Sequence, residues 1–291
     1  MLHLNRQAIK QHADAWKQAG ITTYQFDDAA VAAETKKAPQ WVHFGGGNIF
    51  RAFIAALQQH LLNKGQAKTG IITAETYDEE VIEKVYRPFD NLSLAVTMYA
   101  DGRFENEVIG SVVDSVVCRP DFTEDWNRLK EIFVNPSLQI ASFTITEKGY
   151  KLTNYAGEYF PAVAEDMKNG PEKATSSMGC IAALAYARYK AGAYPFAFLS
   201  MDNCSHNGDK IKAAMTTFAD AWVKNGVADA GFVDYINDPQ KVTFPWSMID
   251  KITPRSSAKV QDYLKGLGFE DTELIHTNKG TYAAFVNAEN A

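Results

Sequence analysis

A run of three glycines marks the part of the sequence with the clearest capacity for chemistry. Residues 45–47 are all glycine, they follow the apolar run 41–44, and an apolar pattern with helical spacing begins directly after them. Glycine at the end of a buried strand lets the chain turn tightly and lets a ligand come close, and a following helix points its free N–H groups at the same spot. Such a turn binds phosphate, and at the start of an α/β domain the usual ligand is a dinucleotide pyrophosphate.

The spacing of these glycines matches the dinucleotide-binding pattern in part. Gly45 and Gly47 supply Gly-x-Gly, but Phe50 stands where the third glycine belongs. A tight strand-to-helix turn without a ligand is therefore the alternative interpretation. If the turn binds pyrophosphate, the expected donors are the amides of Gly45 and Gly47 and of the residues directly after them, Asn48 and Ile49.

An acidic residue ends the next apolar run. Glu75 follows the strand-like residues 70–74. In a dinucleotide fold an acid at this place accepts hydrogen bonds from the adenosine ribose and repels a 2′-phosphate. No arginine follows Glu75 directly, so the sequence favours NAD over NADP. A solvated acid at a strand end is the alternative.

Two polar loops also follow buried strands. Residues 147–150 (EKGY) follow the apolar run 138–146, and residues 202–208 (DNCSHNG) follow the run 196–200. Ligands of open parallel sheets bind at the carboxyl ends of the strands, so both loops are expected at a site. Asn and Gly are also ordinary turn residues, and a neighbouring Glu and Lys can form a plain surface pair.

Tyr186 and Lys190 have the four-residue spacing that short-chain dehydrogenases use for proton transfer. The glycine spacing of that class is missing from the first loop, and Tyr186 falls in an apolar helical pattern. We therefore expect Tyr186 to pack in the core while the lysine side chain extends to solvent.

The composition excludes several classes of protein. A net charge of −6 disfavours a surface that tracks nucleic acid, and no apolar run approaches the ~20 residues that a membrane span needs. The N-terminus lacks the apolar core of a secretion signal. The three cysteines and six histidines are scattered, so no metal site is expected. The scattered cysteines also indicate reduced thiols and a cytoplasmic location.

The polar loops need a frame of alternating strands and helices. Strands are predicted at 41–44, 70–75, 138–146, 196–200 and 281–286, a hairpin at 92–99 and 108–117 through Asp101-Gly102, and helices at 50–62, 120–133, 176–191, 209–224, 228–237 and 260–267. The first long helix is expected to bury one stripe, formed by Phe50, Phe53, Ile54, Leu57, Leu61 and Leu62. The fold class is α/β, a Rossmann-like doubly wound, mostly parallel sheet with a β-hairpin extension and helical insertions. Residues 1–291 are expected to form one domain.

Four motifs in this order give the chain a family resemblance. They are residues 44–53 (FGGGNIFRAF), 144–150 (TITEKGY), 200–208 (SMDNCSHNG) and 247–254 (SMIDKITP). Together they resemble the mannitol dehydrogenase family of long-chain polyol and hexuronate dehydrogenases, over nearly the whole chain from about residue 40. The family departs from the usual glycine pattern in the same way, and Asn48 and Phe53 resemble its hexuronate reductases more than its mannitol dehydrogenases.

The resemblance implies a metal-independent hydride transfer with NAD as the cofactor. A lysine of a helical C-terminal domain would act as the base, and that domain, or a partner chain, would have to complete the site, since its Lys-x-x-x-x-Asn-x-x-His pattern does not occur in this sequence. Within this chain, Asn203 would polarise the carbonyl, with Asn207 as the second choice. Thr146, Glu147 and Lys148 would line the cofactor side and Asp250 the substrate side.

The implied substrate is a small sugar alcohol or sugar acid. The pair mannonate and fructuronate is favoured over a polyol and ketose such as mannitol and fructose. If the lysine is absent, we expect NAD binding with little or no turnover by these residues. A non-catalytic nucleotide-binding or interaction module is the alternative function.

Overall fold

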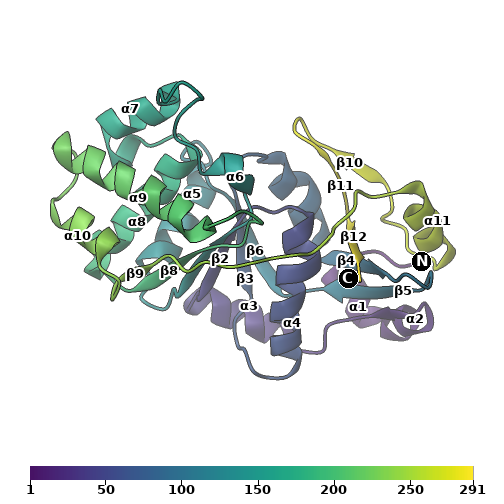
Figure 1. Ribbon diagram of the computed structural model, residues 1–291. Coiled ribbons are helices and arrows are strands. Elements are labelled where there is room, and N and C mark those ends of the chain that lie inside the picture. The colour runs from purple at the N-terminus through teal and green to yellow at the C-terminus, as the bar shows by residue number, and fades with distance from the viewer. Residues whose placement is uncertain (291) are drawn as a thin grey trace. The chain divides into compact units, whose positions relative to one another are not determined.

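The computed structural model describes residues 1–290, which form helices and strands of an α/β protein (Figure 1). The chain divides into two compact units. The first consists of Met1–Lys37, Gly46–Ser115 and the chain from Asp250 onward, and the second of Ala38–Gly45 and Val116–Ile249.

The second unit is built on a parallel sheet. Its strands are β2 (Trp41–Phe44), β7 (Ile140–Phe143), β8 (Phe196–Ser200) and β9 (Val242–Thr243), adjacent in that order. The strands are short and mostly apolar, and Val42, Phe44, Phe143 and Phe198 are fully buried, as expected of a parallel sheet that is covered on both faces. The register pairs Phe44 with Phe143 and Phe143 with Ser200. The carboxyl ends of β2, β7 and β8 therefore lie in one row.

Helices connect these strands. They are α5 (Thr123–Val134), α6 (Thr146–Gly149), α7 (Pro161–Asn169), the short 3₁₀ turn η4 (Pro171–Lys173), α8 (Ser177–Gly192), α9 (Asn207–Lys224) and α10 (Gly231–Asn237). Nine residues of α8 are buried, because it packs against both α5 and α9. The Ser176 side chain accepts a hydrogen bond from the Gly179 N–H and so caps its N-terminus.

The first unit contains a mixed sheet. It has the order β1 (Ile21–Thr22), β5 (Phe104–Ile109), β4 (Ser93–Met98) and β12 (Phe285–Glu289). β4 and β5 are antiparallel, whereas β12 runs parallel to β4 and β1 parallel to β5. α1 (Arg6–Gln11), α2 (Ala13–Gln18) and α11 (Ala258–Gly266) contribute to the hydrophobic core on this sheet, which holds Trp16, Leu94, Leu264 and Phe285.

The remaining elements belong to the first unit, apart from Val116 and Val117 of β6, which belong to the second. They are α3 (Asp28–Lys37), the π-helical turn η1 (Phe50–Ile54), α4 (Ala55–Asn63), β3 (Ile71–Glu75), the π-helical turn η2 (Ile82–Tyr86), the 3₁₀ turn η3 (Arg87–Phe89), β6 (Val112–Val117) and a hairpin of β10 (Leu274–His276) and β11 (Thr281–Ala283). β3 and β6 lie side by side.

The predicted second strand of the hairpin, 108–117, is wrong. β5 ends at Ile109 and β6 starts at Val112, so the run is divided and the hairpin consists of β4 and β5. The two residues between them have other backbone partners. The Gly110 N–H donates to Gln59 Oε1 over 2.6 Å, and the Ser111 carbonyl accepts from the Ile71 N–H over 2.9 Å.

The buried stripe predicted for the helix 50–62 is wrong in part. Leu57 and Leu61 are 49% and 42% exposed, while Gln58 and Gln59 are buried. The π-helical turn η1 adds a residue to one turn and so rotates the later residues relative to the core. Gln59 is satisfied there, because its amide donates to the Glu107 carboxylate and the Val108 carbonyl.

The predicted strand 138–146 is too long, since β7 ends at Phe143 and Thr146 opens α6. The helix 176–191, the strand 196–200 and the helix 209–224 are confirmed with small shifts at their ends. Across residues 1–290, no helix has both the length and the apolar character required to cross a membrane.

Candidate functional site

The first glycine of the turn shapes the end of β2. Gly45 has φ +108°, a conformation that side-chain-bearing residues rarely adopt. A Cβ atom there would lie 2.3 Å from the carbonyl oxygen of Thr144, just past the end of β7. Gly45 is therefore required for the close packing of two neighbouring strand ends, whatever else the turn binds.

The second glycine is held on both sides within the first unit. The Gly46 N–H donates to Glu75 Oε2 over 2.8 Å, and its carbonyl accepts from the Tyr86 hydroxyl over 2.9 Å. A Cβ atom at Gly46 would lie 2.9 Å from the Tyr86 ring. The N–H of Gly46 is thus engaged by the protein.

The space beside the third glycine, Gly47, is open. No heavy atom lies within 4 Å of the position that a Cβ at Gly47 would take. The first helical hydrogen bond runs from the Arg51 N–H to the Gly47 carbonyl over 3.2 Å, so the N–H groups of Asn48 and Ile49 precede it and have no helical acceptor. Open space beside Gly47, at the positive end of a helix, fits a pyrophosphate.

Arg51 fixes the helix that starts at this turn. Its guanidinium is fully buried, and it donates to Ser93 Oγ over 2.9 Å and to the Ala283 carbonyl over 2.8 Å. The side chain therefore ties the first turn of the helix to β4 and to the approach to β12, within the first unit.

The Glu75 carboxylate is 8% exposed and accepts hydrogen bonds from four backbone N–H groups. Besides Gly46, the donors are Thr76, Tyr77 and Asp78, which contact Oε1 at 3.0, 3.0 and 3.4 Å. Burial raises the pKa of this carboxyl and the four donors oppose the rise. A carboxylate has about four acceptor sites, so little of Glu75 is left for a ribose hydroxyl.

In the second unit, Asp202 holds the loop that follows β7. Its carboxylate accepts from the Ile145 N–H over 3.1 Å, the Thr146 N–H over 2.8 Å and the Tyr150 hydroxyl over 2.6 Å. These bonds cap α6 and fix Thr146 at φ +64°, a strained value for threonine. Burial raises the pKa of the Tyr150 hydroxyl and of the Asp202 carboxyl.

The two candidate asparagines differ in their surroundings. Asn207 is 1% exposed; its amide nitrogen donates to the carbonyls of Ser200 and Asp202 and to Ser247, while its oxygen accepts from the Ser247 N–H. Asn203 is exposed, and within residues 1–290 its side chain makes no hydrogen bond. Asn203 is therefore the one whose amide is available to a ligand, and Asn207 supports the loop that carries it.

The remaining predicted residues are at the surface. Glu147 pairs with Lys210 over 3.0 Å, and Lys148 and Thr146 are exposed. These three residues share one loop with Asp202 beneath it. Asp250 is exposed in the first unit.

Tyr186 and Lys190 pack as expected. Tyr186 contacts the rings of Trp222 and Phe232 with centroids 6.5 and 5.1 Å apart, and Lys190 pairs with Asp229 over 2.6 Å. The pair thus belongs to the packing of α8 and carries no open catalytic geometry.

Sequence reasoning missed the residues that hold the loops. The sequence patterns assign no role to Tyr86 or Ser247, and they place Asp202 in a polar loop without a function of its own. An acid two residues after a strand, followed by Asn-x-x-x-Asn, is a signal that could have pointed to Asp202 as the capping residue.

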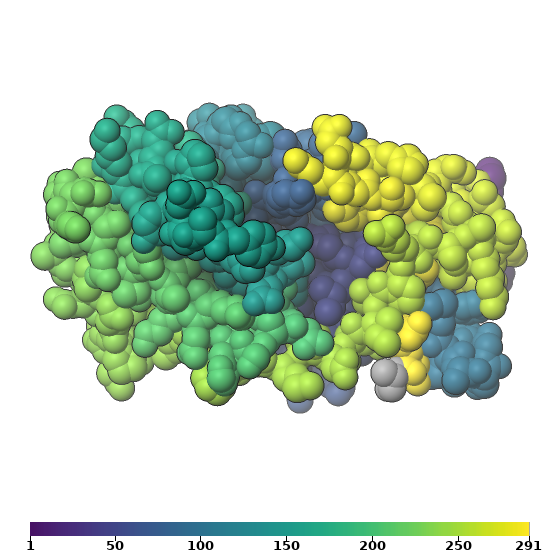
Figure 2. Space-filling model, turned by 45° about the horizontal axis from the view of Figure 1, so that its top comes forward, coloured from purple at the N-terminus to yellow at the C-terminus, as the bar shows by residue number. Residues whose placement is uncertain are grey.

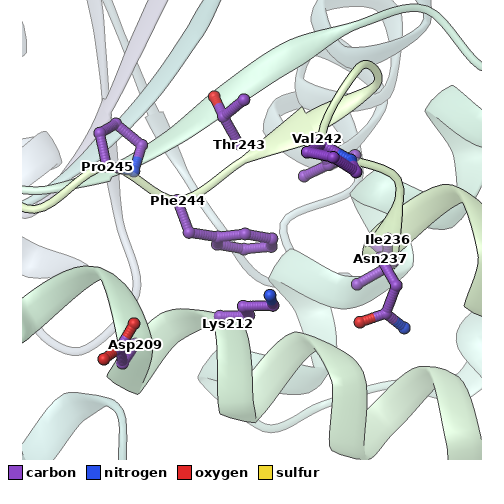
Figure 3. A pocket seen from close by; sticks show the side chains of 9 residues that line it. Asp209, Lys212, Ile236, Asn237, Val242, Thr243, Phe244 and Pro245 are labelled. Atoms are coloured by element: carbon purple, nitrogen blue, oxygen red, sulfur yellow. The ribbon is translucent and has the colours of Figure 1, made fainter.

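One surface groove of about 350 Å³ lies in the second unit (Figure 3). Phe244, Val242 and Thr243 line it from the β9 side, and Lys212 and Asn237 line it from the helices α9 and α10. None of the predicted site residues lines it. Among residues 1–290, no three His, Cys, Asp or Glu side chains gather as ligands for a metal ion.

The comparison with known families decides what this arrangement is. Residues 39–267 match the family described as the mannitol dehydrogenase Rossmann domain. The chain belongs to the mannitol dehydrogenase family. The matched range contains the glycine turn, β3 and both polar loops, so the expected Rossmann-type α/β fold is confirmed.

Known relatives agree with this assignment. The chain is 50% identical over 289 residues to a D-mannonate oxidoreductase of Thermotoga maritima, which covers 99% of this chain and 53% of that protein. It is 29% identical over 242 residues to a polyol:NADP oxidoreductase of Gluconobacter oxydans, covering 81% of this chain and 47% of that protein. The chain spans about half the length of the curated relatives it matches.

A solved structure is also similar. The Pseudomonas fluorescens mannitol 2-dehydrogenase, in ternary complex with NAD and D-mannitol, has a TM-score of 0.74 and 25% identity, and the match covers 99% of this chain and 52% of that one. The family relationship therefore extends from sequence to fold.

Proposed function

We propose that residues 1–291 form the dinucleotide-binding domain of an oxidoreductase that transfers hydride between NAD and a secondary alcohol of a sugar acid, with the mannonate and fructuronate pair as substrate and product. The observation that carries this proposal is the glycine turn, where the space beside Gly47 is open and the N–H groups of Asn48 and Ile49 have no helical acceptor. The 50% identity to a D-mannonate oxidoreductase favours the hexuronate pair over mannitol and fructose.

The residues of this chain divide into binding and supporting roles. We assign the pyrophosphate to the N–H groups of Gly47, Asn48 and Ile49, while Gly45 provides the close packing that forms the turn. The assignment of the ribose to Glu75 remains a prediction, and four backbone N–H donors leave the carboxylate little acceptor capacity for a ribose hydroxyl. NAD, when bound, supplies the nicotinamide carbon that accepts hydride.

On the substrate side, Asn203 is the candidate for polarising the carbonyl as negative charge develops on its oxygen. Asn207 then acts on Asn203 by fixing the loop after β8, through hydrogen bonds to Ser200 and Ser247. Thr146, Glu147 and Lys148 would contact the cofactor and Asp250 the substrate. That a lysine base comes from another domain or chain remains a prediction, as does the cytoplasmic location.

A titration and a set of activity assays test the function. Calorimetric titration of NAD into the 291-residue chain should show one binding site. Assays with D-mannonate, fructuronate and mannitol should then show whether the chain also converts any of these substrates. We expect binding with little or no turnover. Oxidation of mannitol at rates normal for dehydrogenases would contradict the assignment, and absence of any dinucleotide binding would favour the non-catalytic alternative, which the comparisons do not favour.

A further inference from the structure

A distant hairpin packs on the segment that follows β3. The Thr277 and Tyr282 hydroxyls, on the hairpin β10–β11, donate to Asp78 Oδ2 over 2.7 and 3.1 Å. The Asn278 N–H donates to Glu80 Oε2 over 2.5 Å. In Figure 2 this yellow hairpin lies at the surface of the molecule. Residues about 200 positions apart in the sequence therefore form the surface next to Glu75.

The hairpin carries a free cation to this surface. The Lys279 ammonium lies 5.0 Å from the centre of the Tyr77 ring, and Tyr77 is 68% exposed. Within residues 1–290, the Lys279 side chain makes no ion pair or hydrogen bond. Contact with the ring face restrains the lysine without neutralising its charge.

The nearby carboxylates are occupied. Glu75 is 8% exposed and contacts four N–H groups, and Asp78 is 3% exposed and accepts from two hydroxyls. Glu80 pairs with Lys84 over 2.5 Å. The N–H and O–H donors offset part of the negative charge of these carboxylates and so reduce the repulsion that an acid at the end of β3 would exert on a 2′-phosphate. Lys279 remains as the exposed unpaired charge of this edge.

We propose that Lys279, held over Tyr77, forms a subsite for the 2′-phosphate of NADP, so that the chain binds NADP at least as well as NAD. The proposal deepens the proposed function and rests on it, because it assigns the adenosine end of the same dinucleotide to the edge of β3. It replaces the sequence-based preference for NAD, which depended on the residue directly after Glu75. An ammonium and a phosphate dianion attract strongly enough to offset a buried, hydrogen-bonded carboxylate.

Calorimetric titration of NAD, NADP and adenosine 2′,5′-bisphosphate into the full chain tests this subsite. Lys279→Ala should raise the Kd for NADP and for the bisphosphate about fivefold, and Lys279→Glu more than tenfold, with the Kd for NAD changed less than twofold. Lys279→Arg should retain NADP binding. The matched control is Lys259→Ala, which removes an exposed lysine 5.8 Å from the Phe104 ring and should change nothing.

The outcomes separate this subsite from the proposed function. A chain that binds NAD but binds NADP a hundredfold more weakly overturns the subsite and leaves the proposed function intact. Unchanged NADP affinity in Lys279→Glu, with an unchanged thermal unfolding curve, also overturns it. A chain that binds neither dinucleotide overturns both.

Discussion

The Gly46 N–H donates to the Glu75 carboxylate over 2.8 Å, which joins the glycine turn to the end of β3. Three further N–H groups, from Thr76 to Asp78, contact the same carboxylate. One buried acid thus fixes both the turn where pyrophosphate is expected and the edge where adenosine is expected. Its charge stabilises the backbone of the site before any ligand arrives.

Glu75→Gln should therefore weaken both the fold and the site. An amide NH₂ would face a backbone N–H in either orientation, so at least one donor loses its acceptor. We expect the free energy of unfolding in urea to fall by about 1–3 kcal/mol and NAD affinity to fall with it. Glu270→Gln, at an exposed position, is the control. Wild-type stability and affinity in Glu75→Gln would show that the Glu75 carboxylate does not hold the turn and the strand end in this way.

Asp202→Asn should loosen the loop that begins at Thr146. Asparagine cannot accept from the Ile145 and Thr146 N–H groups and the Tyr150 hydroxyl together, so the strained Thr146 conformation loses its support. We expect a loss of about 1–2 kcal/mol in unfolding free energy and weaker dinucleotide binding. Asp220→Asn, at an exposed position on α9, should match the wild type in both measurements.

Substitution of Asn207 and of Asn203 should have different effects on the free energy of unfolding. Asn207→Ala should lower the unfolding free energy by about 2–4 kcal/mol, because several backbone groups around Ser247 lose their buried partner. Asn203→Ala should change it by less than about 0.5 kcal/mol, since this side chain is exposed. Equal losses of stability in both variants would contradict the division of roles.

Stability should fall in weak acid because of His43. Its ring is buried between Ser142 Oγ at 2.7 Å and Thr144 Oγ1 at 2.9 Å, and burial lowers its pKa to about 3. An unfolded histidine titrates near pH 6.5, so between about pH 6.5 and 3 the unfolded chain binds the extra proton and stability decreases as pH falls.

The contribution of His43 is up to about 1.4 kcal/mol for each pH unit in that range. Urea unfolding at pH 7, 6 and 5 measures it. His43→Gln should be less stable at pH 7 but show a flatter pH dependence, whereas His12→Gln, at an exposed position, should retain the wild-type slope. An unchanged slope in His43→Gln would show that another group titrates.

Local patterns in the sequence predicted much of the frame. The buried strand at 196–200 and the helix at 176–191 each depend on residues close together in the chain. The helix 50–62 was harder, because a π-helical turn leaves no mark in an apolar pattern and changes which residues face inward. Gln59 became a buried residue through contacts with β5 that no local pattern contains.

The sequence predicted where the candidate site lies better than it predicted the role of each residue there. Strand-end positions pointed to Glu75 and to the 202–208 loop, but a sequence does not show how many N–H groups a carboxylate accepts from. Asn207 was the second choice after Asn203, and no pattern in the sequence shows that it is buried and hydrogen-bonded to Ser200, Asp202 and Ser247. Lys279 is brought to Tyr77 by a hairpin about 200 residues later, a relationship beyond any motif.

The most direct test of the dinucleotide site is titration of NAD into Gly47→Val. Open space at Gly47 accommodates the side chain, so the fold should lose no more than about 1 kcal/mol, while the isopropyl group occupies the space assigned to pyrophosphate. Gly266→Val, also at a glycine with open space, controls for the substitution itself. We predict that Gly47→Val loses at least tenfold in NAD affinity and that Gly266→Val keeps it; wild-type affinity in Gly47→Val would contradict the account.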